Sequence, residues 1–556
     1  MAWLARARAL IATLRPLHWQ PAFPGLWREW AGADPPGGFD AVIGNPPYVR
    51  QESIKAMKPA LSGLYAAYDG VADLYVYFYE RGLALLRPGG RLSYVVTNKW
   101  LKAGYAEQLR ALLGERAWVE AIFDFGHAKK MFPDADVMPC VLVARRPARE
   151  LAPPEDIRVS VIARDDVDLA RLDAQVQAEA FTLPRQKFGR DEWLLLPKDE
   201  LALFDRLRTR HAPLHDYAGV RPQYGIKTGL NEAFVIDQAT RDRLVAEDPR
   251  SAEVIRPYLR GQDIDRWVSD WAKQWMIVVA SSENRDWPWS SANSQEAADG
   301  IFQKTFPALH RHFAPHRVKM AMREDQGRFP WELRSCAYYA DFHRPKIFYQ
   351  VIQWFPSYCL DRQGLFANDK VYFLPTDDPW LLACLNSPIL WWHNWRFLVH
   401  VKDEGLTPQG YKMEQVPIAA PGGRADAAAA HVETLCAIQV ETHAARRDLL
   451  AWYRTAWEIE RIPNALKDPF DLDAEGFAAA LKNALPRARR RLAVAEVRRI
   501  TEAHRAHIAP IAARLAEARR HEQALADLVL DAYGLTPEDR ALMWRTAPPR
   551  MPVPPP

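Results

Sequence analysis

The fold of this chain is decided by the stretch Gly38-Phe39-Asp40-Ala41-Val42-Ile43-Gly44-Asn45-Pro46-Pro47-Tyr48-Val49-Arg50. Its apolar residues 41–43 are typical of a short buried strand, which the next glycine ends. The two consecutive prolines fix φ and can neither continue a helix nor donate to a strand ladder. The stretch therefore predicts a strand followed by a rigid loop that holds Asn45 at the strand's end, with Tyr48 three residues on. In an open α/β sheet, this edge is where ligands bind.

The residues of this loop suit the capture of a flat heterocycle that carries an exocyclic amine. The Asn45 amide oxygen and the Pro46 carbonyl can each accept one N–H of that amine, and neither Pro46 nor Pro47 has an N–H that competes. Two such acceptors draw the nitrogen lone pair out of conjugation, which makes the nitrogen a nucleophile. Tyr48 can stack on the ring, a contact worth about 1–3 kcal/mol per base. The alternative is a rigid surface turn whose tyrosine only packs.

The quartet Asn45-Pro46-Pro47-Tyr48, with its lead-in 39–44, resembles motif IV of the DNA amino-methyltransferases. These enzymes methylate adenine N6 with S-adenosylmethionine. The resemblance implies that Asn45, Pro46, Pro47 and Tyr48 are catalytic residues and that the target adenine is flipped out of duplex DNA.

Three later segments resemble the motifs that follow in the same family. Asp73-Leu74-Tyr75 lies where motif V begins a helix, which implies that Asp73 contacts the cofactor; capping the helix is the alternative. Residues 91–101 are similar to motif VI. Residues 132–137 resemble motif VIII, which implies that Phe132 stacks on the other side of the flipped adenine. A hydrophobic loop anchor is the alternative for Phe132.

The elements expected in this first region alternate between strand and helix. After the strand at 41–43, the pattern predicts a helix at 73–86, a strand at 91–97, a helix at 102–113, and strands at 119–125 and 137–143. This order indicates part of a mainly parallel sheet with a late antiparallel hairpin. We therefore expect an α/β fold, a partial Rossmann-like methyltransferase sheet, for residues 1–150.

The glycine-rich turn that holds the cofactor in this family is missing before Asn45. The glycines of that interval lie in a Pro-rich context without a strand: Gly25, Gly32, Gly37 and Gly38. The run 18–24 resembles the segment just before motif IV in adenine methyltransferases fused to restriction enzymes. We therefore expect residues 1–150 to be the C-terminal part of a catalytic domain whose S-adenosylmethionine site is incomplete. A partner subunit or a missing N-terminal segment would carry the rest.

Three further regions follow in the expected organisation. Residues 151–186 are Pro- and charge-rich and are expected to be a linker. Residues 187–421 are aromatic-rich and mixed, typical of an α+β domain. Residues 422–556 have a helical pattern and end in a Pro-rich tail from residue 551 that we expect to be disordered.

Several runs of the region 187–421 resemble the TaqI-like target-recognition domain appended to the same methyltransferases: 220–234, 255–264, 345–349 and 385–388. Within the first run, Lys227, Thr228 and Asn231 are typical phosphate and base contacts, and we expect them to bind DNA. For any single basic residue here, a solvated surface role is the alternative. The basic cluster at 486–491 contacts the DNA backbone or is a solvated helix face.

Composition permits these partners and excludes others. A net charge of +4 and a pI of about 8.6 allow nucleic acid as a partner without requiring it. The five cysteines are scattered, with no Cys-x-x-Cys pair, which argues against a disulfide framework and a metal site and favours the cytoplasm. The basic start at 1–10 is too short in its apolar part for a signal peptide, and no segment is typical of a membrane span.

The sequence leads to one main hypothesis and two alternatives. The first is a site-specific adenine methyltransferase of a bacterial restriction–modification or defence system, acting on double-stranded DNA. The second is a DNA-recognition fragment without catalysis, or one subunit of a split enzyme whose partner brings the cofactor site. The third is the C-terminal part of a fused restriction enzyme, although no Pro-Asp…(Asp/Glu)-x-Lys nuclease signature is found here.

Overall fold

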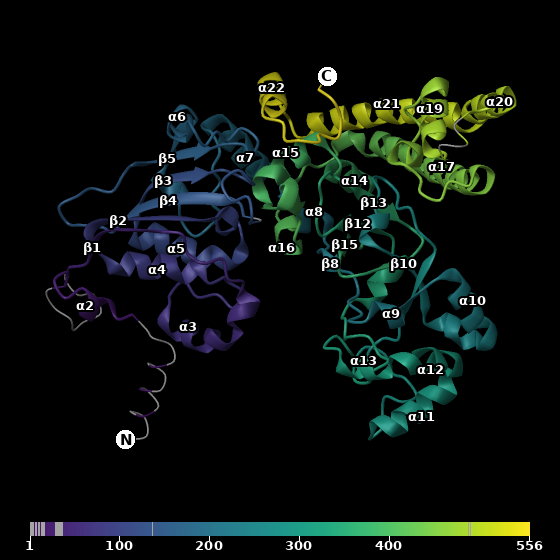
Figure 1. Ribbon diagram of the computed structural model, residues 1–556, viewed down its shortest axis with the longest axis horizontal. Helices are drawn as coiled ribbons and strands as arrows, with labels where there is room; N and C mark the ends of the chain where they lie inside the picture. Colours follow the sequence, from purple (N-terminus) through teal and green to yellow (C-terminus); the bar gives the residue numbers. More distant parts are fainter. Residues whose placement is uncertain are drawn as a thin grey trace. The chain divides into compact units, whose positions relative to one another are not determined.

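The computed structural model describes residues 5, 8, 12, 17–27, 37–135, 137–486, 489 and 491–555. They fall into two compact units (Figure 1). Unit 1 comprises 1–202 and 399–404, and unit 2 comprises 203–398 and 405–556. Most of the basic start at 1–10, together with Gly32, Asp136, Arg487, Ala488 and Arg490, lies outside the described residues.

Unit 1 is built on a six-stranded sheet in the order β1-β2-β4-β3-β5-β6. Its strands are β1 (Phe39–Gly44), β2 (Leu86–Thr97), β3 (Trp118–Asp124), β4 (Pro139–Arg145), β5 (Asp156–Val161) and β6 (Ala180–Pro184). β1 pairs with β2, and β3 with β5, in parallel, whereas β4 is antiparallel to both of its neighbours and β6 to β5. The strands β1, β2, β3 and β5 therefore run in one direction, and their carboxyl ends meet at the same edge.

Helices lie on both faces of this sheet. The described helices of unit 1 are α2 (Trp19–Ala22), α3 (Lys58–Leu64), α4 (Tyr75–Leu85), α5 (Glu107–Arg116) and α6 (Leu172–Ala178). The helices α4 and α5 cover one face of this sheet, and α6 packs on the other, against Phe123 and Val141. Alternate residues of β2, namely Leu92, Tyr94 and Val96, are buried in the same core as α4 and α5. This core includes Trp100 and Trp193, whose rings meet edge to face at 5.2 Å. The expected succession of strands and helices between residues 39 and 145 is confirmed.

The expectation of a buried first strand is wrong. β1 lies at the edge of the sheet, and in the described part of the chain no strand pairs with its outer side. Ala41 is exposed, Ile43 is 80% exposed, and only Val42 packs against the core. A short apolar run is equally typical of a central and of an edge strand, so periodicity alone could not distinguish them.

The expectation of a linker at 151–186 is also wrong, because these residues supply β5, α6 and β6 to the sheet. Inward-facing Ile157, Val159 and Leu183 are nearly or fully buried. Charged residues alternate with them on the other face, and this alternation of a half-buried strand was hidden among the flanking prolines.

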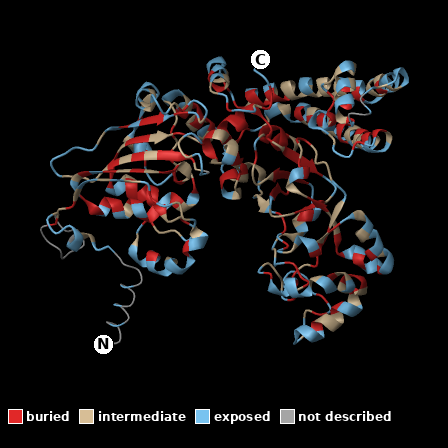
Figure 2. Cartoon of the chain, viewed as in Figure 1, coloured by how far each residue is buried: buried red, intermediate tan, exposed pale blue. Residues whose placement is uncertain are grey.

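Unit 2 contains two four-stranded sheets, with the orders β14-β10-β11-β9 and β13-β12-β15-β8, and a short pair β18-β7. Its strands are β7 (Ala212–Pro213), β8 (Gln223–Tyr224), β9 (Val235–Ile236), β10 (Ile255–Leu259), β11 (Gln274–Ile277), β12 (Lys346–Gln350), β13 (Tyr358–Asp361), β14 (Phe366–Ala367), β15 (Val371–Leu374), β17 (Gly405–Thr407) and β18 (Pro417–Ile418). Both four-stranded sheets are largely buried (Figure 2).

Helices surround these sheets and make up the C-terminal part of the chain. They are α8 (Leu214–Ala218), α9 (Asn231–Phe234), α10 (Gln238–Glu247), α11 (Gln295–Thr305), α12 (Pro307–Phe313), α13 (Arg317–Met322), α14 (Pro379–Leu385), α15 (Pro388–Phe397), α16 (Gly410–Met413), α17 (Ala425–Trp457), α18 (Asn464–Lys467), α19 (Ala474–Ala484), α20 (Val494–Ala503), α21 (Ala509–Ala532) and α22 (Pro537–Arg545). α7 (Lys198–Arg210) includes residues of both units. No helix in the described ranges is both long enough and apolar enough to cross a bilayer.

The Pro-rich tail, expected to be disordered, is ordered through residue 555. Arg266 Nη1 donates to the Pro552 carbonyl at 3.3 Å, and Val553 is only 4% exposed. Just before the tail, Trp391 Nε1 donates to the Pro549 carbonyl at 3.0 Å. Composition predicted disorder, but these buried donors need acceptors, and the carbonyls of a proline-rich segment provide them.

Candidate functional site

The loop after β1 places Asn45 and Tyr48 at the edge where the parallel strands end. Asn45 follows β1 directly and is exposed, whereas Pro46 is buried. Tyr48 is half-buried, and its hydroxyl donates to the carbonyl of Val95 in β2 at 3.2 Å. This bond ties the loop across to the neighbouring strand. The aromatic ring is therefore held at a fixed place beside an open amide side chain.

The phenol of Tyr48 stays neutral in this position. Burial, and next the nearby Cys140 thiol, raise the pKa of Tyr48 to about 12. A neutral phenol keeps its donated hydrogen bond to Val95 over the whole physiological pH range. The contribution of Tyr48 is thus a fixed ring, not a titrating base.

Asp73 anchors the second half of the loop. Its Oδ1 accepts the backbone N–H of Gln51 at 2.9 Å, and next to it the N–H of Leu74 donates to the Val49 carbonyl at 3.0 Å. The helix cap considered for Asp73 is not formed, because the N-cap of α4 is Leu74 and no side chain caps it. Burial raises the pKa of Asp73, opposed mainly by the Gln51 N–H and then by the charge of Lys99.

A second polar pair, missed in the sequence, lies at the same edge. Asp124 ends β3, and Asn98 Nδ2 donates to both of its carboxylate oxygens, at 2.9 and 3.2 Å. The Gly126 N–H donates to Asp124 Oδ1 at 3.0 Å. Burial raises the pKa of Asp124 despite these donors. The available signal was an acidic residue closing an apolar strand, at the edge where ligands bind in open sheets.

The structure brings some expected site residues together and leaves others apart. Cys140 in β4 is in register with Asp124 in β3 and with Val96 in β2, and Tyr48 is bound to the adjacent Val95, so Tyr48, Cys140 and Asp124 lie in one neighbourhood. Phe132 lies in the loop between β3 and β4, half-exposed, and its carbonyl accepts the Ala135 N–H at 3.2 Å. Between the described side chains of Phe132 and Tyr48 there is no ring contact, and the stacking role of Phe132 stays a prediction.

The expected DNA-binding residues lie in unit 2 and differ in accessibility. Lys227 is exposed, and its Nζ is 2.8 Å from Asp325 Oδ2. Thr228 is only 3% exposed, and its hydroxyl donates to Asn231 Oδ1 at 2.6 Å. Thr228 and Asn231 therefore stabilise their own turn; Asn231 is exposed like Lys227, and Thr228 alone of the three is buried.

The edge of unit 1 fits one part of an S-adenosylmethionine site. Asp73 and Asp124 could accept hydroxyl or amine donors of such a ligand, and Asn98 orients Asp124. The turns that follow the described strands of unit 1 contain at most one glycine each. A glycine-rich turn, which lets backbone approach a ligand closely, is therefore not found in this part of the chain.

Comparisons with known proteins point to one group. Residues 7–132 match the family described as Eco57I restriction-modification methylase, and residues 424–529 match a domain of unknown function, DUF8810. The chain is 32% identical over 390 residues to the Type II methyltransferase M.XhoI of Xanthomonas vasicola, covering 66% of each chain. It is 27% identical to the Type II methyltransferase M.PaeR7I of Pseudomonas aeruginosa, covering 64% of this chain and 59% of that protein.

The chain thus spans about two thirds of the length of the curated relatives it matches. Among solved structures, the Type IIL restriction-modification enzyme MmeI in complex with DNA aligns with 91% of this chain and 56% of its own, at 12% identity and a TM-score of 0.46.

The substitution Asp124→Asn tests the raised pKa of this carboxyl group through the pH dependence of thermal stability. Its pKa is raised above the ordinary 3.8, so the folded state binds this proton more tightly than the unfolded state. Stability contributed by this group therefore increases as pH falls from neutral toward 3.8. As the pH is lowered, we expect the Tm of the parent chain to rise relative to the Tm of Asp124→Asn. Differential scanning fluorimetry measures both Tm values.

Asp168→Asn is the control for Asp124→Asn. The hydrogen bond from Arg171 lowers the pKa of the exposed Asp168, so its Tm difference should move in the opposite direction over the same range. Equal trends for the two variants would contradict the assignment of a penalised, buried carboxylate at Asp124.

Proposed function

We propose that this chain is a site-specific DNA methyltransferase of a restriction–modification system that transfers a methyl group from S-adenosylmethionine to adenine N6. The supporting observation is the loop 45–48, which presents an exposed amide at the carboxyl end of β1 beside a ring fixed by Val95. The curated relatives carry the name Type II methyltransferase, which agrees with this chemistry.

In the proposed reaction, the loop polarises the amine of a flipped adenine. Asn45 Oδ1 and the Pro46 carbonyl accept the two N–H groups, and the Tyr48 ring stacks on the base. The lone pair of the amine nitrogen is freed for attack, and the amine proton leaves to solvent after the new N–C bond has formed. S-adenosylmethionine, when bound, would supply the methyl group from its sulfonium, whose S–CH3 bond breaks as the N–C bond forms and leaves a neutral thioether. Phe132 is proposed to cover the second face of the base, and Asp73 to contact the cofactor.

Unit 2 is proposed to position double-stranded DNA, with Lys227, Thr228 and Asn231 as the residues that the sequence pattern suggests. Of these, Lys227 has the most support, because its exposed ammonium group can reach a phosphate. Thr228 and Asn231 would act by shaping the turn that carries Lys227.

We also propose that the rest of the cofactor site comes from polypeptide outside these 556 residues, either a partner subunit or an N-terminal segment. Support comes from the open side of β1, where Ile43 is 80% exposed and one more parallel strand can pair. An edge strand leaves a row of N–H and C=O groups unpaired, which another chain segment can pair with.

Asn45→Ala is expected to abolish adenine methylation while leaving DNA binding unchanged, because it removes one of two amine acceptors from an exposed position. The measurement is N6-methyladenine by mass spectrometry after incubation of unmethylated genomic DNA with S-adenosylmethionine. Asn293→Ala, at another exposed asparagine, is the control. Because further polypeptide is proposed to complete the cofactor site, parent and variant are both assayed with that polypeptide supplied. Methylation by Asn45→Ala at the parent rate would contradict the assigned acceptor, and no N6-methyladenine with the completed parent enzyme would refute the function.

Tyr48→Ala and Tyr48→Phe separate stacking from anchoring. Loss of the ring should weaken binding of a duplex with a mismatched target adenine by about 1–3 kcal/mol. Tyr48→Phe keeps the ring and loses only the bond to Val95, so we expect its affinity to remain near that of the parent. Fluorescence anisotropy on this duplex measures both, and equal affinities for Tyr48→Ala and the parent would exclude stacking.

Calorimetric titration of S-adenosylmethionine tests the proposed completion of the site. We expect no binding, or binding weaker than about 1 mM (roughly −4 kcal/mol), to the 556-residue chain, because it lacks a glycine-rich turn in its described part. Micromolar binding would show that the cofactor site is complete within this chain.

A further inference from the structure

Unit 2 contains a cavity of about 570 Å³ between β8, the loop 334–339 and the start of β15. It is lined by a cationic and an aromatic group of residues, of which the proposed function uses only Lys227. One group is cationic: Lys227, Arg334 and Lys370. The other is aromatic: Tyr224, Tyr338 and Tyr339. A cavity of this size can hold a nucleotide.

The cations at this cavity are only partly neutralised. Asp325 is shared by Lys227, at 2.8 Å, and Arg334, at 3.6 Å, while Lys370 pairs with Asp369 at 3.0 Å. Three positive charges thus meet two negative ones. The cationic side chains are 55, 66 and 70% exposed, whereas Asp325 is 13% exposed, so the positive ends face solvent. This arrangement suits an anion that approaches from outside.

The backbone that presents Lys227 is fixed. β8 pairs with β15 through Tyr224 and Tyr372, and the Gly225 N–H donates to the Val371 carbonyl at 2.9 Å. A Cβ at Gly225 would lie 2.0 Å from the Asn368 carbonyl oxygen, so only glycine permits this close approach. On the opposite wall, Asn284 Oδ1 accepts the Cys336 N–H at 2.9 Å. Both walls are therefore ordered before a ligand arrives.

One aromatic ring is open for stacking. Tyr224 is 47% exposed, with its other side supported by Tyr372 at a ring distance of 4.0 Å. Tyr339 is held by its hydroxyl, which donates to the Arg334 carbonyl at 2.9 Å. An exposed ring next to cations is the combination that binds a nucleotide through its phosphate and one flat face.

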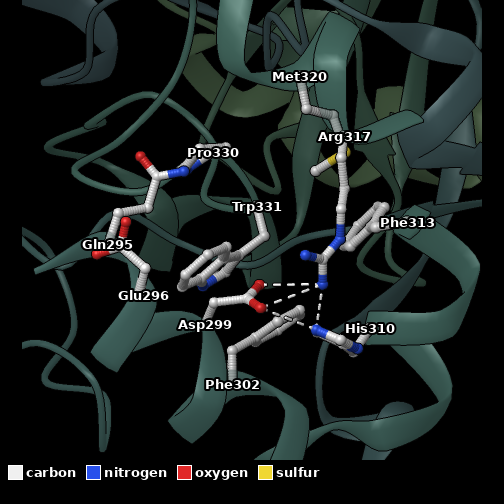
Figure 3. A pocket seen from close by; sticks show the side chains of 10 residues that line it. All are labelled: Gln295, Glu296, Asp299, Phe302, His310, Phe313, Arg317, Met320, Pro330 and Trp331. Carbon is white, nitrogen blue, oxygen red and sulfur yellow. Dashed lines mark hydrogen bonds and ion pairs between the residues drawn. The ribbon is translucent and has the colours of Figure 1, made fainter. Parts of the chain in front are cut away.

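A second cavity of unit 2 contains an arginine that is paired with a carboxylate within the cavity. It has a volume of about 240 Å³, and Figure 3 shows Arg317 directed to Asp299 and His310 within it. Arg317 Nη2 lies 3.1 Å from Asp299 Oδ1, and His310 Nε2 lies 3.2 Å from Asp299 Oδ2. Its single arginine is paired with Asp299, and Glu296 also lines the cavity, so this cavity offers less to an anion.

We propose that the cavity lined by Lys227, Arg334 and Lys370 holds a phosphate of the DNA backbone, with the attached nucleotide against Tyr224. The inference rests on the proposed function and adds Tyr224, Arg334 and Lys370 as DNA-positioning residues. A phosphate is the same whichever base is attached to it, so a contact with it carries no sequence information. The contact therefore positions the duplex and does not read its sequence.

Salt dependence of DNA binding tests this proposal. Lys227→Gln, Arg334→Gln and Lys370→Gln are combined in one variant, and fluorescence anisotropy with labelled duplexes of two unrelated sequences gives affinities between about 50 and 200 mM salt. Loss of one phosphate contact should lower the slope of log K against log salt concentration by about 0.9, equally for both sequences. Tyr224→Ala should weaken binding about fivefold or more and leave the slope unchanged.

Arg317→Gln, in the second cavity, is the matched control and should leave the slope unchanged. An unchanged slope in the triple variant, or a loss confined to one sequence, would overturn the proposal while the proposed function stands. If the parent chain binds neither duplex, the proposed function fails together with it. Thermal unfolding of each variant shows that the substitutions leave the fold intact.

Cys336 provides a second readout inside the cavity. Its thiol is half-buried on the cavity wall, and burial raises its pKa, so alkylation by N-ethylmaleimide is followed at mildly alkaline pH. Duplex DNA should slow this reaction at least several-fold in the parent chain and much less in the triple variant. Equal rates with and without DNA in a parent chain that binds DNA would overturn the proposal.

Discussion

The rigidity of the loop 45–48 is the constraint on which the candidate site depends. Two prolines fix the backbone, but they fix it only relative to the strand before them. The hydrogen bond from Tyr48 to Val95 ties the loop to β2, and the bond from Gln51 to Asp73 ties its continuation to the start of α4. The backbone that carries Asn45 is thereby fixed, although its side chain is exposed. Such preorganisation is what a site needs if it is to polarise an amine at the moment of reaction.

The edge around this loop has a consistent electrostatic character. Two carboxyl groups, Asp73 and Asp124, are kept there by backbone and amide donors although burial penalises their charge. A protein that only needed stability would gain by replacing them with apolar residues. Asp124 at the carboxyl end of β3, and Asp73 bound to the continuation of the loop that carries Tyr48, are therefore placed for a binding role. Asn98 is then a positioning residue, because its hydrogen bonds fix the orientation of the Asp124 carboxylate.

Much of unit 1 was predictable from the sequence. Its strands and helices have a clear periodicity of apolar residues, and glycine or proline residues separate several of them. The positions of α4 and of the apolar part of β2 follow from the two apolar runs on either side of residues 87–90, although these four residues belong to β2 as well. The place of β1 at the sheet edge was not predictable, because strand order depends on contacts distant in sequence. The strands β5 and β6 were missed for a related reason, since short alternating strands among prolines and charges look like a linker.

The candidate site was predictable in its loop and not in its surroundings. Asn45 and Tyr48 follow from a local pattern of residue types, whereas the pairing of Asn98 with Asp124 joins the ends of two strands that are separated by β4. In unit 2, Lys227 was identified from residue type alone, but Arg334 and Lys370 come from segments more than a hundred residues away. Only the folded chain shows that these cations share one cavity.

The prolines after β1 have a consequence beyond the geometry of the site. An edge strand with an exposed isoleucine offers unpaired N–H and C=O groups to any similar strand, which is the usual route to intermolecular β-aggregation. Pro46 and Pro47 have no N–H to give, so a ladder started on β1 cannot extend past Gly44. The same two residues that hold Asn45 in place therefore act as gatekeepers of the edge. Selection for solubility and selection for chemistry would favour the same sequence at this point.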